Sequence, residues 1–313
     1  MIYKILFKRE NIPFFLFLVT CFFSRLNSKF YLIDILGQLS FQILICGIIL
    51  FFIFLILKKL FVSMICILFC IFLTIDILSS CNRCNAFIED KSQIHNKIRL
   101  MLFNVNHENQ IKDFEILLEL ILFEKPDIIL FQEVSPQAQN KLKSLESFFH
   151  YKIGPNNPIS PFASIILSNY ALKENKEVDD FAIVTSVIVN GMELKIIGYH
   201  LYPQFNQALF NLAIKQTNYL KNLVKNNNKN LILMGDLNMT PASKRFTNFL
   251  NETNLYTYMS YKNPTFTWPT FLPDYLGIQV DHILFSKNFK MIGKKTTDYF
   301  ESDHRPLIVD LAF

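Results

Sequence analysis

Two long apolar runs near the N-terminus dominate the hydrophobic pattern of the chain. Residues 35–57 contain no charged side chain, and residues 60–78 are interrupted only by Asp76. At about 1.5 Å per helical residue, each run is long enough to cross a hydrocarbon core of about 30 Å. The Lys58–Lys59 pair between them marks a polar turn. The pattern therefore predicts a hairpin of two transmembrane helices, over about 35–57 and 60–79.

A third, shorter apolar run covers about residues 12–24. Its length also suits an interfacial helix or the apolar part of a signal peptide. Cytoplasmic ends of membrane spans carry an excess of Lys and Arg. Basic side chains within residues 4–9 and the Lys58–Lys59 pair lie on one side of the membrane only if all three runs cross it. We therefore expect a multi-pass protein with everything after residue 80 on the outer side. The alternatives are two spans, or a buried helix pair in a soluble protein.

Beyond the apolar runs the pattern changes to an alternation of strands and helices. Residues 81–97 are polar and read as a linker, and no repeat with a period of 20 to 50 residues follows. Short apolar runs predict strands, and runs with apolar side chains three or four residues apart predict helices. The predicted strands are 98–105, 127–131, 163–168, 181–189, 193–199, 231–235, 279–285 and 307–311, and the predicted helices are 110–125 and 207–224. Residues 98–313 thus form one α/β domain.

Composition and charge limit the partners of this domain. Hydrophobic residues make up 51% of the chain and charged residues 18%, below the roughly 25% charged share of ordinary soluble proteins. Residues 1–90 hold 8 of the 31 basic and 5 of the 26 acidic side chains, which leaves 23 against 21 in the remainder. A domain this close to neutral does not have the strongly basic surface of proteins that wrap nucleic acid. A local basic groove remains compatible with these numbers.

Six of the apolar strands carry an acid, an amide or an imidazole at one end. These residues are Asn104, Gln132 and Glu133, His200, Asp236 and Asn238, Asp281 and His282, and Asp303 and His304. A carboxylate beside a dry core is costly unless it is paired or binds a metal. Side chains two residues apart on a strand face the same way, as Asp236 and Asn238 would. The set supplies carboxylates for a divalent cation, imidazoles for proton transfer and amides that orient an anion.

The motifs that contain these residues resemble those of the endonuclease/exonuclease/phosphatase superfamily. They are NVN at 104–106, LFQEV at 130–134, GYH at 198–200, GDLN at 235–238, DHILFS at 281–286 and SDH at 302–304. The resemblance extends over residues 98–313 and is greatest to bacterial members with N-terminal membrane helices. It implies a deoxyribonuclease-I-like, four-layer α/β/β/α sandwich of two mainly antiparallel sheets flanked by helices. One departure is Gln279, which stands where relatives often carry a basic residue.

The resemblance also implies a reaction, the hydrolysis of a phosphate ester by in-line attack of water. Glu133 is expected to hold Mg²⁺ or Mn²⁺, with Asn104 and Asp303 close enough to share the ion. His304 is the expected general base, with Asp281 orienting its ring. Asp236 orients or deprotonates the attacking water, and its role stays interchangeable with that of His304.

Amides and a second imidazole complete the expected site. Asn238, His200 and Asn104 are expected to contact the substrate, and the first two donate hydrogen bonds to the phosphoryl oxygens. Trp268 is expected at the mouth of the site, whereas His282, His95, His107 and His150 are read as structural. Each site residue also has a structural alternative: a salt bridge for Glu133, a core histidine for His200, and turns or helix caps for Asn104, Asp236, Asn238 and Asp303.

The substrate is less determined than the reaction. The first hypothesis is a membrane-anchored, magnesium-dependent nuclease or general phosphodiesterase. The alternative is a lipid or inositol-phosphate phosphohydrolase of the sphingomyelinase kind, which membrane anchoring would place near lipid headgroups. A third reading is a non-catalytic membrane protein that uses the fold for binding. The expected partners are a phosphate ester and the lipid bilayer, and nothing in the sequence indicates a protein partner.

Four of the six cysteines lie in the apolar runs and behave there as small hydrophobic residues. Cys81 and Cys84 follow the last run. A lone CxxC pair is weak evidence for zinc, and in an oxidising compartment it would form a local disulfide. Residues 78–81 also resemble a lipoprotein processing site. The sequence leaves the state of these two cysteines open.

Overall fold

The computed structural model describes residues 9–80, 83–87, 96–108, 111–154, 160, 163–174, 181–227, 229–259, 264–298 and 301–313. Its contacts divide the chain into two compact units. The helical unit comprises Met1–Asn82, Gln204–Asn211 and Met239–Phe249, and the sheet unit comprises Arg83–Pro203, Leu212–Asn238 and Leu250–Phe313. Two segments of the predicted α/β domain therefore belong to the same unit as the N-terminal helices.

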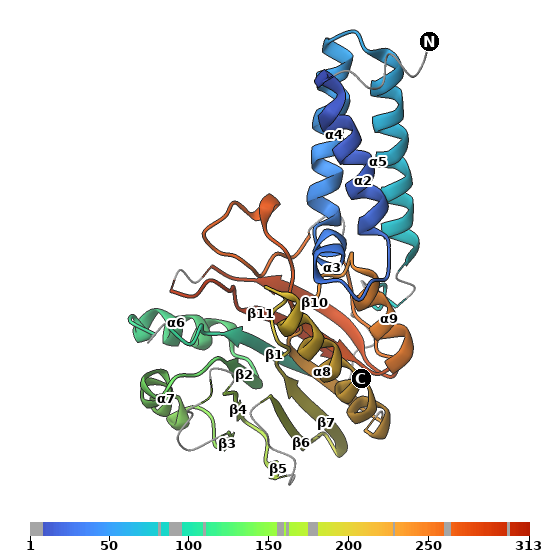
Figure 1. The fold of residues 1–313 in the computed structure, drawn as a ribbon. Helices are drawn as coiled ribbons and strands as arrows, with labels where there is room; N and C mark the ends of the chain where they lie inside the picture. Colours follow the sequence, from blue (N-terminus) through green and yellow to red (C-terminus); the bar gives the residue numbers. More distant parts are fainter. Residues whose placement is uncertain are drawn as a thin grey trace. The chain divides into compact units, whose positions relative to one another are not determined.

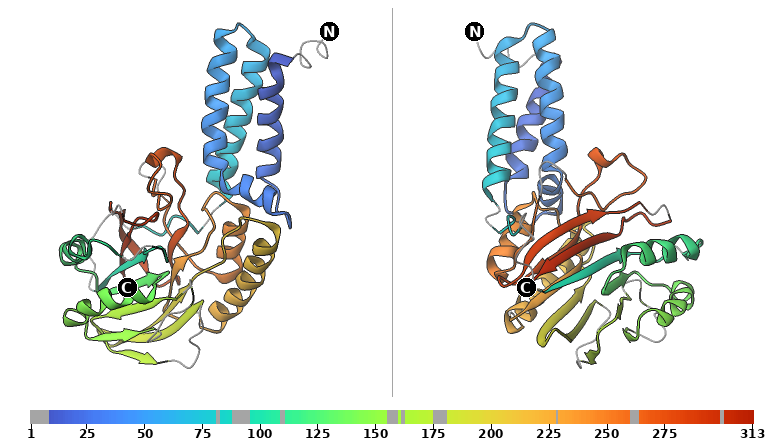
Figure 2. Two further views of the ribbon diagram at one scale, coloured as in Figure 1. Left: turned by 60° about the vertical axis from the view of Figure 1, so that its left-hand side comes forward. Right: turned by 180° about the vertical axis from the view of Figure 1, so that it is seen from behind.

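The helical unit is built from four N-terminal helices and a short 3₁₀ turn. These are η1 (Arg9–Asn11), α2 (Ile12–Ser24), α3 (Tyr31–Gln38), α4 (Ser40–Ile56) and α5 (Leu60–Ser80). Helices α2, α4 and α5 run side by side (Figures 1 and 2). Phe14, Phe17, Phe54 and Leu73 are buried between them. Gly47 permits the close approach of α2 and α5 to α4, because a Cβ there would lie 2.5 Å from the Phe17 ring and 2.6 Å from Cys70 Sγ.

The outward faces of these helices are apolar. Ile56 is 78% exposed, Leu60 67% and Phe72 57%. Among the described helices, only α5 is by itself long and apolar enough to cross a membrane, and α3 with α4 passes the same test only as a pair bent by 68°. The expected continuous helix over 35–57 is thus broken between Gln38 and Ser40. The third run forms α2, which has 13 residues.

The described residues of the sheet unit form two β-sheets. The strands are β1 (Lys97–Asn104), β2 (Ile128–Gln132), β3 (Tyr151–Ile153), β4 (Ile165–Ser168), β5 (Leu172–Glu174), β6 (Ala182–Val189), β7 (Met192–Tyr199), β8 (Leu231–Asp236), β9 (Asp281–Phe285), β10 (Lys290–Thr296) and β11 (Leu307–Ala312). One sheet has the order β10-β11-β1-β2-β4-β3 and the other β5-β6-β7-β8-β9. All pairings are antiparallel except β1 with β2 and β7 with β8.

Helices cover the outer faces of both sheets. Helices α6 (Phe114–Glu124) and α7 (Pro136–Leu142), followed by η2 (Lys143–Ser147), pack on the six-stranded sheet, and α8 (Gln207–Asn226) lies over the other (Figures 1 and 2). Alternate strand residues such as Leu100, Leu130, Ile196 and Ile232 are fully buried in the core between the sheets. These layers match the mixed α/β sandwich that the resemblance implies. The remaining elements are α9 (Lys244–Thr253) and η3 (Asp274–Leu276).

Two strand pairs, the parallel pair β1–β2 and the antiparallel pair β8–β9, bring polar strand ends together. Asn104 lies opposite Gln132 at the end of β1 and β2, and Asp236 lies opposite Asp281 at the edge of β8 and β9. Gly235 is required just before Asp236, since a Cβ there would lie 1.8 Å from the carbonyl oxygen of Tyr199 on β7. The sequence GD at this position thus lets two strands converge where a carboxylate is presented.

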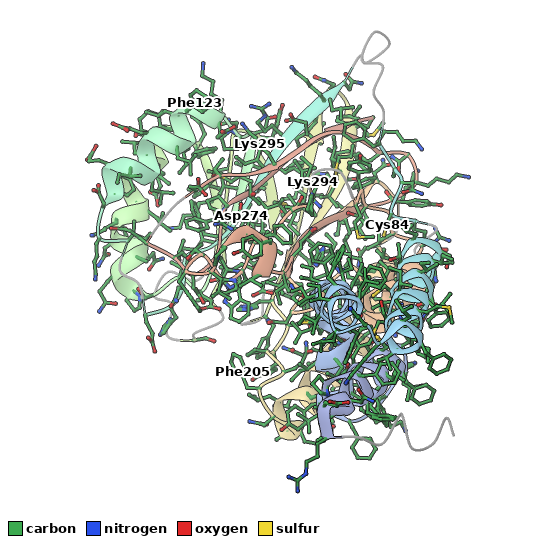
Figure 3. All side chains as sticks on the ribbon, turned by 90° about the horizontal axis from the view of Figure 1, so that it is seen from above. Cys84, Phe123, Phe205, Asp274, Lys294 and Lys295 are labelled. Atoms are coloured by element: carbon green, nitrogen blue, oxygen red, sulfur yellow. The ribbon has the colours of Figure 1, made fainter. Side chains whose placement is uncertain are left out.

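Part of the predicted linker is paired with the sheet unit. Asn85 forms a bridge with Tyr258, and Phe87 forms one with Met291. Ala86 is buried; its N–H donates to the carbonyl oxygen of Thr257, and its carbonyl oxygen accepts the backbone N–H of Met291. Cys84, labelled in Figure 3, is disulfide-bonded. Cys81 and residues 88–95 lie outside the described residues.

Candidate active site

Asp236 is the centre of a cluster of buried polar side chains in the sheet unit. Its Oδ2 lies 3.6 Å from His200 Nε2 and 3.7 Å from His304 Nε2. Its Oδ1 accepts a hydrogen bond of 2.9 Å from the backbone N–H of Asn238, and its own backbone N–H donates to Gln132 Oε1 at 2.7 Å. The last contact joins the two sheets, because Gln132 ends β2 and Asp236 ends β8. The carboxylate is therefore fixed from both sheets.

Glu133 and Asn104 lie on the other side of this carboxylate. Asn104 is fully buried and its Nδ2 donates to Glu133 Oε1 at 2.8 Å and to Asp236 Oδ2 at 3.4 Å. Glu133 Oε2 accepts the backbone N–H of His107, and Glu133 Oε1 lies 3.6 Å from His200 Nε2. The predicted ligand Asn104 thus presents its N–H donors, not its oxygen, to the two carboxylates. Its oxygen accepts the backbone N–H of Asn106.

Backbone strain accompanies Glu133. Its φ is +57°, in the left-handed region that residues other than Gly, Asn and Asp rarely adopt. Strain of this kind costs on the order of 1–3 kcal/mol and is kept where the surrounding structure fixes it.

His304 and Asp281 form a direct pair. His304 Nδ1 lies 2.8 Å from Asp281 Oδ2, and both side chains are buried. Burial, the largest single influence, favours the neutral ring, but the charge and hydrogen bond of Asp281, with the charges of Asp236 and Asp303, raise the pKa of His304 from 6.5 to about 10. The ring is accordingly an imidazolium at neutral pH, with one N–H directed to Asp281 and the other towards Asp236. Such a ring donates protons and does not accept them.

Asp303 is held away from this cluster by two donors. Asn106 Nδ2 binds its Oδ1 at 2.8 Å and Trp268 Nε1 binds its Oδ2 at 2.9 Å. Ser302 links the same turn to β1 through a hydrogen bond of 2.7 Å to the carbonyl oxygen of Asn104. Trp268 lies, as expected, beside the site. Asn106 and Ser302 were not singled out from the sequence, although both stand inside the NVN and SDH motifs.

The remaining predicted substrate contact, Asn238, also fastens a loop. Its φ is +47° and its Nδ2 donates to the carbonyl oxygen of Leu201 at 2.9 Å. This bond ties Leu201, which follows His200, to Asn238, which stands two residues after Asp236. His282, read as structural, contacts Gln279 through its Nδ1 at 3.3 Å.

A loop between Thr267 and Gln279 borders the pair of Asp281 and His304. Thr267 Oγ1 accepts the backbone N–H of Asp281, and the backbone N–H of Arg305 donates to the Thr267 carbonyl. Asp274, labelled in Figure 3, forms a salt bridge of 2.8 Å with Arg305. The loop is thereby anchored to the residue that follows His304.

Two overlapping groups in the described part of the chain have donor sets suited to a metal ion. One is Glu133, His200 and Asp236, and the other is Asp236, Asp281 and His304; within each group the ligand atoms lie within 4.8 Å of one another. Asp303 belongs to neither of these groups among the described residues. In the second group His304 Nδ1 and Asp281 Oδ2 are joined to each other by a hydrogen bond. The first group, with two carboxylates from different sheets, therefore fits a hard divalent cation better.

A two-sheet sandwich with carboxylates and imidazoles at one edge is the architecture of deoxyribonuclease-I-like proteins. The chain belongs to the Endonuclease/Exonuclease/phosphatase family, whose model matches residues 101–304. The resemblance seen in the motifs is thus confirmed at the level of the family. Comparison with curated proteins finds no match.

Solved structures show the same fold at low sequence identity. The human nocturnin catalytic domain with bound sulfate is 19% identical, with a TM-score of 0.54 over 69% of this chain and 94% of that one. An endonuclease/exonuclease/phosphatase from Beutenbergia cavernae DSM 12333 is 15% identical, with a TM-score of 0.54 over 69% and 72%. A magnesium-bound mutant of beta toxin from Staphylococcus aureus is 15% identical, with a TM-score of 0.53 over 68% and 99%. At these identities the likeness concerns the fold.

Proposed function

We propose that the chain is a membrane-anchored, divalent-metal-dependent hydrolase of phosphodiesters. The observation that carries the proposal is the convergence of Glu133, His200 and Asp236 beside the buried pair of Asp281 and His304. Three carboxylates next to two imidazoles, one of them cationic, match the charge of a phosphodiester and of a metal ion bound with it. A purely structural role would not require five ionisable groups at one sheet edge.

Glu133 and Asp236 are the residues that would hold the ion, which we propose to be Mg²⁺. Mg²⁺ binds oxygen ligands and usually uses one or two carboxylates while it keeps several waters. When bound, the ion neutralises charge on the phosphate and on the departing oxygen. Asn104 maintains the site by directing its N–H donors at both carboxylates.

The sequence left open whether His304 or Asp236 deprotonates the attacking water, and the protonation state of His304 distinguishes the two. The carboxylates around His304, Asp281 above all, raise its pKa to about 10, which favours the imidazolium as a hydrogen-bond donor over the neutral ring that a general base requires. We therefore assign the orientation and deprotonation of the attacking water to Asp236. His304 and His200 donate hydrogen bonds to the phosphoryl oxygens as the ester P–O bond breaks and the new P–O bond to water forms.

Membrane anchoring rests on the helical unit. The outward side chains of α2, α4 and α5 are apolar, and α5 satisfies the requirements for a span by length and composition. In water such a surface would be an aggregation hazard. The distribution of basic residues favours the outer side for residues 81–313 if α2, α4 and α5 all cross the bilayer.

Reporter fusions test this topology. A reporter that is active only outside the cytoplasm is expected to give signal when fused after Phe313, and a cytoplasmic reporter is expected to give signal when fused after Lys59. The Lys58–Lys59 turn and the basic N-terminus both prefer the inner face. Cytoplasmic activity of the fusion after Phe313 would mean that an even number of segments crosses the membrane.

Nucleic acid was the first substrate class inferred from the sequence, and a specific surface feature favours phospholipid as a second candidate. The loop that carries Trp268 exposes Phe271 to 75%, Tyr275 to 61% and Leu276 to 41%. This loop is attached to Asp303 through Trp268 and to Arg305 through Asp274. Exposed aromatic side chains next to a phosphodiesterase site fit substrates whose apolar tails stay in a bilayer.

A substrate panel distinguishes the candidates. The full-length protein is assayed with Mg²⁺ on DNA, on RNA and on sphingomyelin vesicles, with EDTA as the blank. Phosphodiester hydrolysis that depends on Mg²⁺ is expected. A Phe271→Ser, Tyr275→Ser variant is expected to lose at least about tenfold activity on vesicles only if phospholipid is the substrate, with Phe123→Ser on α6 as the control because Phe123 is equally exposed.

The two outcomes assign the substrate class. Cleavage of nucleic acid that this double variant leaves unchanged would support the nuclease candidate. Absence of Mg²⁺-dependent cleavage on every phosphodiester, including a small chromogenic one, would overturn the proposed function.

A further inference from the structure

The N-terminal helices contact segments that continue directly from the active-site strands. We propose that they do more than anchor the chain: Gln38 at the end of α3 is a positioning residue that holds the loop following Asp236 and Asn238. The inference rests on the proposed function, since the loop matters only if these residues act in hydrolysis. It concerns contacts inside the helical unit, to which segment Met239–Phe249 belongs.

Gln38 binds Thr240 in two ways. Its Oε1 accepts the backbone N–H of Thr240, and its backbone carbonyl accepts the Thr240 hydroxyl at 3.0 Å. Its Nε2 donates to Asp34 Oδ2 at 2.9 Å and to Gln204 Oε1 at 3.4 Å. Both Gln38 and Thr240 are buried, with 7% and 4% exposure. Thr240 is only two residues beyond Asn238, so its position limits the course of the GDLN turn.

The break between α3 and α4 makes this contact available. An uninterrupted helix over 35–57 would use the Gln38 carbonyl as a hydrogen-bond acceptor within the helix. Ending α3 at Gln38 leaves that carbonyl to accept the Thr240 hydroxyl instead. The N-terminal helices thus bind the loop, at Thr240, where the bend between α3 and α4 interrupts the expected span.

Charged groups hold the same segment at a second point. Arg25, at the end of α2, donates to the carbonyl oxygen of Ala242 at 2.9 Å and forms a salt bridge with Asp76 of α5. Lys244 binds Asp76 at 3.1 Å. This explains Asp76, the single charge that interrupts the last apolar run. A charge so placed is tolerated when it is paired, and here one partner, Arg25, also contacts the loop at Ala242 and the other, Lys244, follows it.

The segment that follows β7 is held in a similar way. Gln207 Oε1 accepts the backbone N–H of Tyr31 at 3.1 Å, and Gln207 Nε2 donates to the carbonyl oxygen of Lys29 at 2.8 Å. Asp34 lies 3.5 Å from Arg245 Nε, and the Arg245 guanidinium lies over the Phe210 ring. The N-terminal helices therefore bind both segments that leave the parallel strands β7 and β8. These strands end next to His200 and at Asp236.

Loss of the Gln38 amide is expected to lower turnover more than substrate binding. Leucine at position 38 removes the acceptor for the Thr240 N–H while it keeps similar volume, so a buried donor is left without its partner. A displacement of about 1 Å in a catalytic group can cost about a hundredfold in rate. We expect Gln38→Leu to reduce kcat by about 10- to 100-fold and to change KM by less than about twofold.

The experiment uses the full-length protein in detergent with Mg²⁺ and bis(p-nitrophenyl) phosphate. Gln137→Leu is the matched control, because Gln137 is exposed on α7. Hydrogen exchange of backbone amides over residues 237–243 is measured on the same samples, and Gln38→Leu is expected to speed exchange there and Gln137→Leu is not. Thr240→Val, which removes the hydroxyl donor, is expected to lower kcat, whereas Thr240→Ser is expected to retain it.

The outcomes separate this inference from the proposed function. Unchanged kcat and unchanged exchange in Gln38→Leu would overturn the inference. If Gln38→Leu does not fold, equal kcat values in Thr240→Val and Thr240→Ser would overturn it instead. Absence of probe hydrolysis by the unmodified protein would contradict the proposed function, and the exchange measurement would still decide whether Gln38 holds the loop.

Discussion

Replacing Glu133 by glutamine is expected to abolish metal-dependent hydrolysis and to leave the fold intact. Glu133 is one of the two carboxylates that converge with His200, and it is half-buried at the edge of the sheet unit rather than in its core. Glutamine keeps the volume of the side chain but removes the negative charge that a divalent cation requires. We expect single-turnover rates to fall by at least about a thousandfold, which corresponds to about 4 kcal/mol of transition-state stabilisation.

Stability gives an independent check on this assignment. In the absence of metal the clustered carboxylates of Glu133 and Asp236 repel each other, so Glu133→Gln is expected to leave the melting temperature unchanged or to raise it. Binding of Mn²⁺ by calorimetry is expected to weaken at least about tenfold. Glu119→Ala, on the exposed face of α6, is the control and is expected to change neither property. Wild-type turnover in the Glu133 variant after EDTA treatment and Mg²⁺ addition would contradict the role.

The sequence pattern predicted the strands that surround the site because each is apolar and ends at a polar residue. Thus β1, β2, β7, β8 and β9 all fall within two residues of their expected ends nearest the site. The edge strand β10 was missed because its sequence, KMIGKKT, has only two adjacent apolar side chains, shows no alternation and includes a glycine. Helix α7 was missed because it has 7 residues and a polar sequence, PQAQNKL, with little apolar periodicity.

Contacts between distant segments account for what the sequence did not predict. Residues 104, 236 and 304 were expected at one site from their motifs, but the direction of each side chain depends on its neighbours. Asn104 donates to both carboxylates because its oxygen is taken by the backbone of Asn106. Gln38 and Thr240 are 202 residues apart. Hydrophobic periodicity describes only neighbouring residues and cannot predict a contact between segments so far apart. The link between the N-terminal apolar segment and the GDLN turn is therefore seen only in the folded chain.

Removing the charge of Asp281 is expected to slow hydrolysis through His304. Asp281→Asn keeps a side chain of the same shape, with an oxygen that can accept a hydrogen bond from His304 Nδ1, but removes the carboxylate charge that raises the pKa of His304. The pKa of His304 should therefore fall. Because the imidazolium is present below this pKa and is lost as the pH rises through it, the alkaline limb of the rate profile should move to lower pH. By analogy with other carboxylate-oriented imidazoles, we expect the rate at neutral pH to drop by about 10²- to 10⁴-fold.

The double variant tests whether Asp281 and His304 act as one unit. His304→Ala is expected to cost at least as much as Asp281→Asn, and the combination is expected to be little slower than His304→Ala alone, since residues that act through each other are strongly non-additive. Single-turnover hydrolysis at saturating Mg²⁺ is the measurement, and His150→Ala, on the exposed surface, is the control. Losses that multiply fully would show that Asp281 contributes independently of the ring. The charge on His304 would then have to be stabilised by Asp236, whose carboxylate already faces its Nε2, and the assignment of the water's proton to Asp236 would have to be revised.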